Sequence, residues 1–177
     1  MPLIYAPSNK LRQIFKASGI LFYRHIGDKL YFLFQCEERK EHNNEKSVHF
    51  IGGKRENFEN AMECAVREFC EETDCKIKPY VFYNLLKSGN RKDYWFEQGK
   101  YILYIDECPR KYYDIDVQFN VKSNDNKLYW ISLDELLSAI QSGDNVYVSR
   151  EWKEINTYKL SYMTVAIMKE LYMNSKH

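Results

Sequence analysis

The segment from Asn60 to Thr73, NAMECAVREFCEET, constrains the fold of this chain more than any other stretch. At about 100° per residue its packing residues share one arc, and these residues are Met62, Ala65, Val66, Phe69 and Thr73. The opposite arc carries Glu68, Glu71 and Glu72, with only small side chains beside them. Asn60 and Glu63 have the spacing of a capping pair. The pattern predicts an amphipathic helix with a packing face and an acidic face.

Three glutamates on one helix face are compatible with two kinds of surface. Like charges one turn apart cost only a few tenths of a kcal/mol on an exposed helix, so a solvated face is allowed. In a half-buried setting, a pair about 6 Å apart would repel by roughly 3 kcal/mol at an effective dielectric constant of 20. A multivalent cation would then be needed. Burial therefore decides between a solvated face and a metal site.

The spacing Gly-x5-Glu-x7-Arg-Glu-Phe-x-Glu-Glu, which runs from Gly53 to Glu72, resembles the signature box of the Nudix hydrolases. The resemblance covers most of residues 16 to 142, including a strand that runs into two glycines and the late segment WISLDEL. Within the box at residues 53 to 75, two positions depart from the family pattern. Asp74 stands where the family usually has glycine, and Cys75 where it usually has a larger aliphatic residue. These departures concern the exit of the helix and leave the carboxylates in place.

The order of elements predicts an α+β protein, and the resemblance implies a Nudix-like α/β/α sandwich with a mixed central sheet. We expect one domain over residues 1 to 177, because a chain of this length can close a core without staples. Residues 37 to 46 are predicted as a loop. Strands are expected at 17–24, 29–35, 48–51, 80–86, 99–105 and 127–131. Helices are expected at 60–73, at the segment DELLSAIQ after Ser132, and at about 158–173.

Resemblance to the family implies hydrolysis of a nucleoside diphosphate linked to another group, with Mg²⁺ or Mn²⁺ as the required ion. Hard divalent ions prefer carboxylate oxygens and water as ligands. By position in the box, Glu68 and Glu72 are the best metal ligands and the best catalytic residues, Glu71 is a further ligand, and the Gly53 carbonyl is an additional one. Arg67 is expected to pair with Glu59 in a structural role, although a plain surface ion pair is the alternative.

A general base must take a proton from the attacking water. The resemblance leaves a box glutamate or Asp125, five residues before Trp130, as the base, while Asp125 also suits a simple turn in SNDNK. Lys54 and Arg55 follow the glycine pair directly. They are predicted to contact substrate phosphate, with solvated side chains as the alternative.

Two stretches interleave aromatic and basic residues, NRKDYWFEQGK and PRKYY. Tyr94, Trp95, Tyr112 and Tyr113 are therefore candidates for stacking on a nucleobase, with packing in a sheet as the alternative. The 5′ cap of messenger RNA, cleaved to release m7GDP, is the first substrate to consider. A diphosphoinositol polyphosphate or a dinucleoside polyphosphate is the second. A binding module with a degenerate box is the third, and the intact glutamates argue against it.

A formal net charge of +1 argues against a broad basic surface for nucleic acid, and DNA is not an expected partner. No apolar run has the length of a membrane span, so no membrane partner is expected. The five cysteines contain no CxxC pair, which argues against a disulfide framework or a zinc site. We expect a cytoplasmic protein with reduced thiols, although a mature form whose secretion leader had been removed would look the same.

Overall fold

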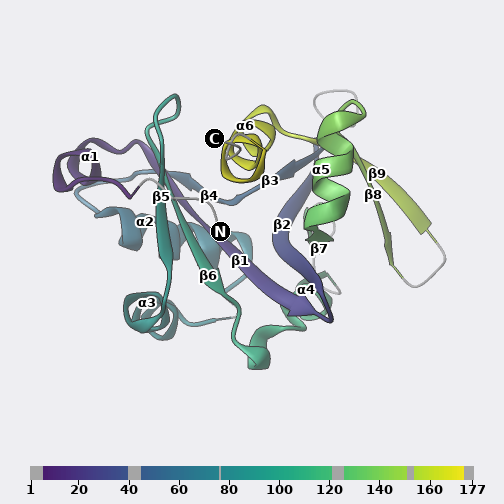
Figure 1. Ribbon diagram of the computed structural model, residues 1–177. Coiled ribbons are helices and arrows are strands. Elements are labelled where there is room, and N and C mark those ends of the chain that lie inside the picture. The colour runs from purple at the N-terminus through teal and green to yellow at the C-terminus, as the bar shows by residue number, and fades with distance from the viewer. Residues whose placement is uncertain (1–5, 40–44, 76, 121–125, 151–153, 174–177) are drawn as a thin grey trace. The chain divides into compact units, whose positions relative to one another are not determined.

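The computed structural model describes residues 6–39, 45–75, 77–120, 126–150 and 154–173 (Figure 1). Its contacts divide the chain into two compact units that interleave in sequence. The first unit takes Met1–Tyr23 and Phe50–Arg110, and the second takes Arg24–His49 and Lys111–His177. A single domain over the whole chain stays a prediction. Each unit is described below by itself.

The first unit contains a mixed sheet in the order β5–β6–β1–β4. Strand β6 runs parallel to β1, while β5 and β4 are antiparallel to their neighbours. Ser18 of β1 lies opposite Gly53 of β4, which places the glycine pair beside the central strand β1. The elements of this unit are α1 (Asn9–Ile14), β1 (Ala17–Ile26, whose last three residues belong to the second unit), β4 (Ile51–Lys54), α2 (Ala61–Glu72), α3 (Pro79–Ser88), β5 (Lys92–Phe96) and β6 (Tyr101–Glu107).

Three phenylalanines form the centre of this unit. Phe69 of α2 stacks on Phe82 of α3 with ring centroids 4.5 Å apart, and both meet the edge of Phe22 of β1 at 5.6 and 5.5 Å. All three side chains are almost completely buried. Burial of each ring contributes about 1.5–3 kcal/mol relative to exposure. Phe69, which directly follows Glu68, therefore sets the position of α2 on the sheet.

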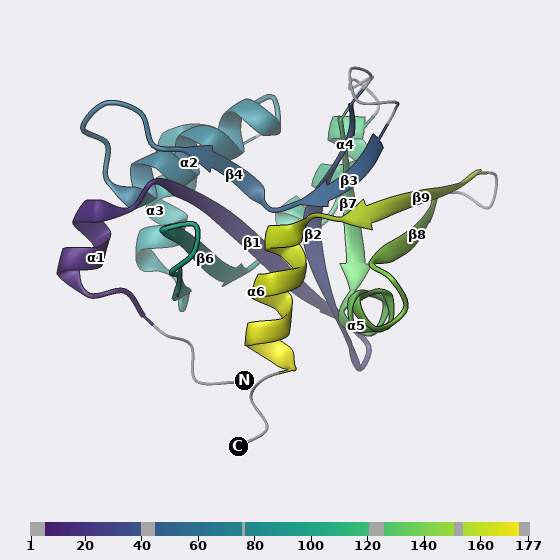
Figure 2. The same cartoon turned by 90° about the horizontal axis from the view of Figure 1, so that it is seen from above.

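The second unit also contains a mixed sheet, in the order β7–β2–β3–β9–β8, with β9 parallel to β3 and the other pairs antiparallel. Figure 2 shows α5 beside β7 and β8, which it contacts. The Thr164 hydroxyl of α6 donates to the Val48 carbonyl of β3 at 3.1 Å. The elements are β2 (Lys29–Arg39), β3 (Glu45–His49), α4 (Ile115–Asn120), β7 (Asn126–Ser132), α5 (Leu133–Gln141), β8 (Asn145–Arg150), β9 (Glu154–Leu160) and α6 (Tyr162–Tyr172).

Mixed sheets with packed helices confirm the predicted α+β class. Residues 80–86, predicted as a strand, instead lie in α3, and this prediction was wrong. Pro79 occupies the first turn of that helix, where its missing N–H costs nothing. Phe82 and Leu86, four residues apart, are both buried, as one face of a helix requires. The aromatic residues of the segment favoured a strand, but its buried residues recur with the period of a helix.

Other differences concern boundaries. The helix predicted from residue 158 begins at Tyr162, because residues 154–160 pair as β9 and Ser161 caps the helix. The strand predicted at 48–51 is divided at Phe50 into β3 and β4, and the glycine pair lies inside β4. Strand pairing also extends into the predicted loop, where Glu38 lies opposite Lys46. Among the helices of the described residues, none is both long and apolar enough to cross a membrane.

Strand β5 was not predicted, and it changes the interpretation of two candidate substrate residues. Tyr94 and Trp95 are adjacent in β5, so their side chains point to opposite faces of the sheet. Their exposures are only 2% and 3%, so both faces of the strand are covered there. Neither ring is available to stack on a substrate in this structure. The prediction that these two residues bind substrate is corrected: they pack the sheet.

We predict that Tyr94→Ala lowers the free energy of unfolding by roughly 3–5 kcal/mol, because it empties a buried aromatic site. The matched control is Tyr80→Ala, since Tyr80 is 65% exposed on α3 and surface substitutions usually stay within about 0.5 kcal/mol. Urea denaturation of both variants provides the measurement. A Tyr94→Ala protein as stable as the unmodified chain would contradict the packing role.

Candidate active site

The start of α2 is held by hydrogen bonds that the sequence predicts. The Asn60 side chain accepts from the Glu63 amide at 2.9 Å, and the Glu63 carboxylate accepts from the Asn60 amide at the same distance. The Ser18 hydroxyl of β1 donates to the Ala61 carbonyl at 2.8 Å. The predicted capping pair is therefore confirmed, and a buried hydroxyl fixes the first turn of α2 to the sheet.

Glu68 lies directly against Gly53. A Cβ atom added to Gly53 would collide with all three atoms of the Glu68 carboxyl group. The Glu68 side chain is only 13% exposed. Burial raises the pKa of this carboxyl group, and the Arg67 guanidinium partly opposes the rise. The half-buried setting that distinguishes a cation site from a solvated face is thus present at Glu68.

The guanidinium of Arg67 joins the strand end, the following loop and the helix. It donates to both carboxylate oxygens of Glu59 at 2.8 and 3.1 Å, and to the Lys54 carbonyl at 2.8 Å. It also donates to Glu68 Oε1 at 2.9 Å and to Glu71 Oε2 at 3.2 Å. The ion pair implied by the family resemblance therefore forms, and Arg67 additionally neutralises two glutamates of the acidic face.

The Arg67–Glu59 pair is stronger than an isolated surface ion pair. The two side chains are only 22% and 14% exposed, and paired guanidinium–carboxylate bonds are among the stronger hydrogen bonds in proteins. Hydrogen bonds from Arg67 hold the pKa of the Glu59 carboxyl group below its ordinary value, against the opposing effect of burial. The bonds to Glu59 in turn raise the pKa of Arg67. Both groups are charged at neutral pH.

The three glutamates differ in their exposure. Glu71 is 57% exposed, while Glu68 is largely buried and Glu72 is half-buried. Among the residues that the structure describes, no three His, Cys, Asp or Glu side chains converge in an arrangement that could hold a metal ion. The Arg67 guanidinium is the counterion of Glu68 and Glu71 in this arrangement. The oxygen donors and the desolvated Glu68 still fit a hard divalent cation, which Nudix hydrolases generally use.

The other predicted residues have separate positions. Lys54 is exposed at the end of β4. The Arg55 guanidinium donates to the carbonyls of Gln13 and Glu59 at 2.8 and 3.0 Å and lies 4.4 Å from the centre of the Phe15 ring. Arg55 therefore anchors the chain locally. These contacts give the Arg55 side chain a structural role that is separate from the predicted contact with substrate phosphate. Asp125 lies outside the described residues.

Tyr112 and Tyr113 belong to the second unit, at and after the 3₁₀ turn Arg110–Tyr112. Arg24 lies 4.3 Å from the centre of the Trp130 ring and 5.0 Å from that of Tyr113. It also donates to the Tyr113 carbonyl at 2.9 Å. The segment PRKYY thus contributes one ring to an aromatic–cation cluster, whereas the segment containing Tyr94 and Trp95 packs a sheet.

Tyr101 was not predicted from the sequence; it is buried against Gly19 and Gly52. A Cβ atom at Gly19 or at Gly52 would collide with the Tyr101 hydroxyl. Burial raises the pKa of this phenol, and the nearby Cys64 and Glu68 raise it further. A glycine inside a strand often marks a close approach of another group, so Gly19 and Gly52 were signals that could have indicated a neighbour.

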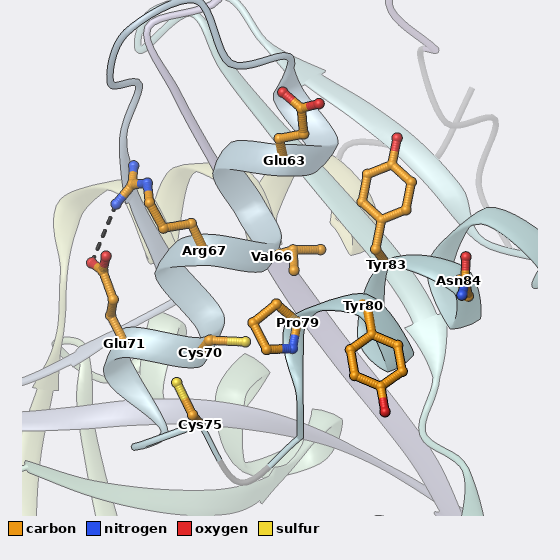
Figure 3. A pocket seen from close by; sticks show the side chains of 10 residues that line it. All are labelled: Glu63, Val66, Arg67, Cys70, Glu71, Cys75, Pro79, Tyr80, Tyr83 and Asn84. Atoms are coloured by element: carbon orange, nitrogen blue, oxygen red, sulfur yellow. Dashed lines mark hydrogen bonds and ion pairs between the residues drawn. The ribbon is translucent and has the colours of Figure 1, made fainter.

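A groove of about 600 Å³ lies between α2 and α3 (Figure 3). Arg67 and Glu71 line the side formed by α2, and Tyr80 and Tyr83 line the side formed by α3. The other lining residues are Glu63, Val66, Cys70, Cys75, Pro79 and Asn84. The sequence analysis could not predict this groove, because it assigned residues 80–86 to a strand. Glu68, the buried carboxylate, is not among the lining residues.

We predict that Gly53→Ala and Gly52→Ala have different effects. The new methyl group at Gly53 meets the mobile end of the Glu68 side chain, so the fold survives while the carboxylate is displaced and divalent-ion affinity falls at least about tenfold. The methyl group at Gly52 meets backbone atoms of Ser18 and Gly19 at 2.5 and 2.6 Å, which costs roughly 1–3 kcal/mol of stability. Mn²⁺ calorimetry and urea denaturation separate the two effects. Unchanged Mn²⁺ binding by folded Gly53→Ala would contradict the role given to Glu68.

Comparison with known proteins identifies the family of the chain. The family model of the NUDIX domain matches residues 16–152. An uncharacterised protein of Acanthamoeba polyphaga mimivirus is 26% identical over 162 residues, which are 91% of this chain and 37% of that protein. This chain therefore spans little more than a third of that relative's length.

Two solved structures resemble the chain more distantly. The Nudix hydrolase RenU from M. smegmatis has a TM-score of 0.49 and 14% identity, over 89% of this chain and 83% of that chain. An Ap4A hydrolase from C. elegans has a TM-score of 0.38 and 17% identity, over 71% of this chain and 85% of that chain. The family match covers well over half of the sequence and includes the whole box from Gly53 to Cys75. The chain therefore belongs to the Nudix hydrolase family.

Proposed function

We propose that this chain hydrolyses a phosphoanhydride bond in a nucleoside-diphosphate-linked substrate, with Mg²⁺ or Mn²⁺ as its cofactor. One observation supports this most strongly: the Glu68 carboxylate is desolvated against Gly53, at the junction of β4 and α2. Arg67 supplies a single positive charge beside Glu59, Glu68 and Glu71, so a further cation would relieve the repulsion that remains. The family to which the chain belongs supplies the reaction class.

Glu68 and Glu72 would hold the metal ion, with Glu71 and the Gly53 carbonyl as further ligands. When bound, Mg²⁺ or Mn²⁺ supplies neutralisation of the diphosphate oxygens, which allows water to attack. Arg67 keeps Glu68 in place through its bond to Oε1, while its bonds to Glu59 and the Lys54 carbonyl keep the strand end beside the helix. The role of Arg67 is therefore to position ligands.

A carboxylate of this chain must accept the proton of the attacking water. Glu72 is the candidate on α2, where it follows Glu68 by one helical turn and is half-buried. Asp125 is the second candidate, and it lies outside the described residues. A substitution of each, Asp125→Asn and Glu72→Gln, distinguishes them through the pH dependence of turnover.

We predict that Glu72→Gln lowers turnover at least about a hundredfold, the scale of losing a positioned catalytic group. The substitution keeps the shape of the side chain and removes its charge. Glu63→Gln is the matched control, since Glu63 lies on the same helix and bonds to the Asn60 amide. Circular dichroism verifies the fold of both proteins. Full activity of a folded Glu72→Gln protein would exclude the catalytic role.

The substrate that we propose to test first is capped RNA, with release of m7GDP. Tyr94 and Trp95 are buried, so the stretch that contains them no longer supports binding of a nucleobase. The second stretch keeps its support, because Arg24, Tyr113 and Trp130 form a half-buried aromatic–cation cluster. Such clusters suit stacking on flat bases. A very anionic diphosphoinositol would need several converging lysines and arginines, and Arg55 is already bound to backbone carbonyls.

The decisive experiment is a substrate panel in Mg²⁺ and in Mn²⁺. It contains capped RNA, a dinucleoside polyphosphate, a nucleotide sugar and a diphosphoinositol polyphosphate, with products separated by chromatography. We expect cleavage of the capped RNA to m7GDP, lost in Glu72→Gln. Rapid turnover of the diphosphoinositol without cap cleavage would replace the substrate assignment. Absence of cleavage across the panel, together with retained nucleotide binding, would instead favour a binding module.

A further inference from the structure

Cys70 and Cys75 lie close together at the exit of α2. Cys75 donates its backbone N–H to the Cys70 carbonyl at 2.6 Å. The Cys70 thiol donates to the Ile77 carbonyl at 3.3 Å. The turn after the box helix therefore brings the backbone of Cys75 to that of Cys70.

The backbone at the helix exit produces this approach. Asp74 and Cys75 have φ angles of 54° and 50°, two consecutive residues in the left-handed region. Residues other than glycine rarely adopt this conformation. The turn directs the chain back across the end of α2, where the Thr73 hydroxyl donates to the Phe69 carbonyl at 2.6 Å. The two positions that depart from the family pattern, 74 and 75, are the ones that bring Cys75 to Cys70.

One thiol of the pair is accessible to a small reagent. Cys75 is exposed, whereas Cys70 is buried, and both cysteines line the groove between α2 and α3. Figure 3 shows their sulfurs at the same end of that groove. The other cysteines of the chain, Cys36, Cys64 and Cys108, are buried and do not line the groove. Cys75 is therefore the thiol that an oxidant reaches first, with Cys70 as its neighbour.

We propose that Cys70 and Cys75 form a reversible intramolecular disulfide, a modification site at the exit of the box helix that takes a hydroperoxide as oxidant. Hydrogen peroxide transfers one oxygen to the Cys75 sulfur, which gives a sulfenic acid and one water. The Cys70 sulfur then attacks the Cys75 sulfur, the S–S bond forms, and the sulfenic oxygen leaves as a second water. Two thiols together lose two protons and two electrons, which the peroxide takes up. A dithiol reverses the change by exchange.

The disulfide would act on the neighbouring acidic face. Its formation removes the thiol hydrogen that Cys70 donates to Ile77, and it joins the exit segment covalently to the residue before Glu71. A shift of about 1 Å in a catalytic group can lower turnover by a hundredfold. On the proposed function, the oxidised protein therefore turns over at least about tenfold more slowly, and reduction restores it. This consequence rests on the proposed function, whereas formation of the disulfide does not.

Tryptic digestion gives a sharp test, because residues 68–76, EFCEETDCK, form one peptide that contains both cysteines. The chain of residues 1–177 is treated with hydrogen peroxide, blocked with iodoacetamide and digested. We expect this peptide without alkylation and about 2 Da lighter than its dithiol form, with recovery of both alkylation sites after dithiothreitol. Cys64 lies in the preceding peptide, so a Cys64–Cys70 bond would join two peptides instead.

Two variants complete the test. Cys75→Ser changes an exposed side chain and should abolish the loss of about 2 Da from the peptide. Cys36→Ala removes a buried cysteine of β2, and the peptide of this variant should still show the mass change. A sulfenic acid or glutathione adduct on Cys75 with Cys70 still alkylated would overturn the proposal, as would a bond to Cys64. If the disulfide forms but turnover is unchanged, the modification site stands and the effect on the acidic face is excluded. A chain that forms the disulfide and cleaves nothing in either redox state contradicts the proposed function alone.

Discussion

The guanidinium group of Arg67 is the contact on which the candidate site depends. It binds Glu59, the Lys54 carbonyl, Glu68 and Glu71 at the same time. Without it, the end of β4 and the acidic face of α2 would have no common partner, and several carboxylates would lie together uncompensated. A positive charge at this place is therefore required by the glutamates themselves. A divalent ion serves the same electrostatic need, which is why a network centred on Arg67 is a suitable setting for metal-dependent chemistry.

Packing places this network where it can act. Phe69 stacks on Phe82 against Phe22, so Phe69 is fixed in the core and sets the position of Glu68 beside it. Gly53 leaves room for the Glu68 carboxyl group, and Gly52 leaves room for the Tyr101 hydroxyl. The two adjacent glycines thus have different functions. Gly53 admits the Glu68 carboxylate, and Gly52 allows a strand to lie over a buried phenol.

The sequence predicted the parts of the site that depend on local chemistry. The capping pair at Asn60 and Glu63 and the burial of Ala65, Val66 and Phe69 follow from spacing along one helix, and the family resemblance implied the pairing of Arg67 with Glu59. Features that depend on long-range packing were not predictable. Tyr94 and Trp95 looked like surface rings because basic residues flank them, but β5 is covered on both faces. Residues 80–86 looked like a strand until their burial showed helical periodicity, and the groove beside α2 exists only because they form α3. Asp125 stays a prediction.

The central claim is that the buried carboxylate of Glu68, together with its neighbours on α2, holds a divalent ion. Anomalous diffraction from crystals grown with Mn²⁺ tests this most directly, because it locates the ion without reference to any substrate. The account predicts an anomalous peak within coordination distance of Glu68 and the Gly53 carbonyl, with Glu72 or Glu71 as a further ligand. A Mn²⁺-saturated crystal with no peak at that position, and Glu68 still bound only to Arg67, would contradict it.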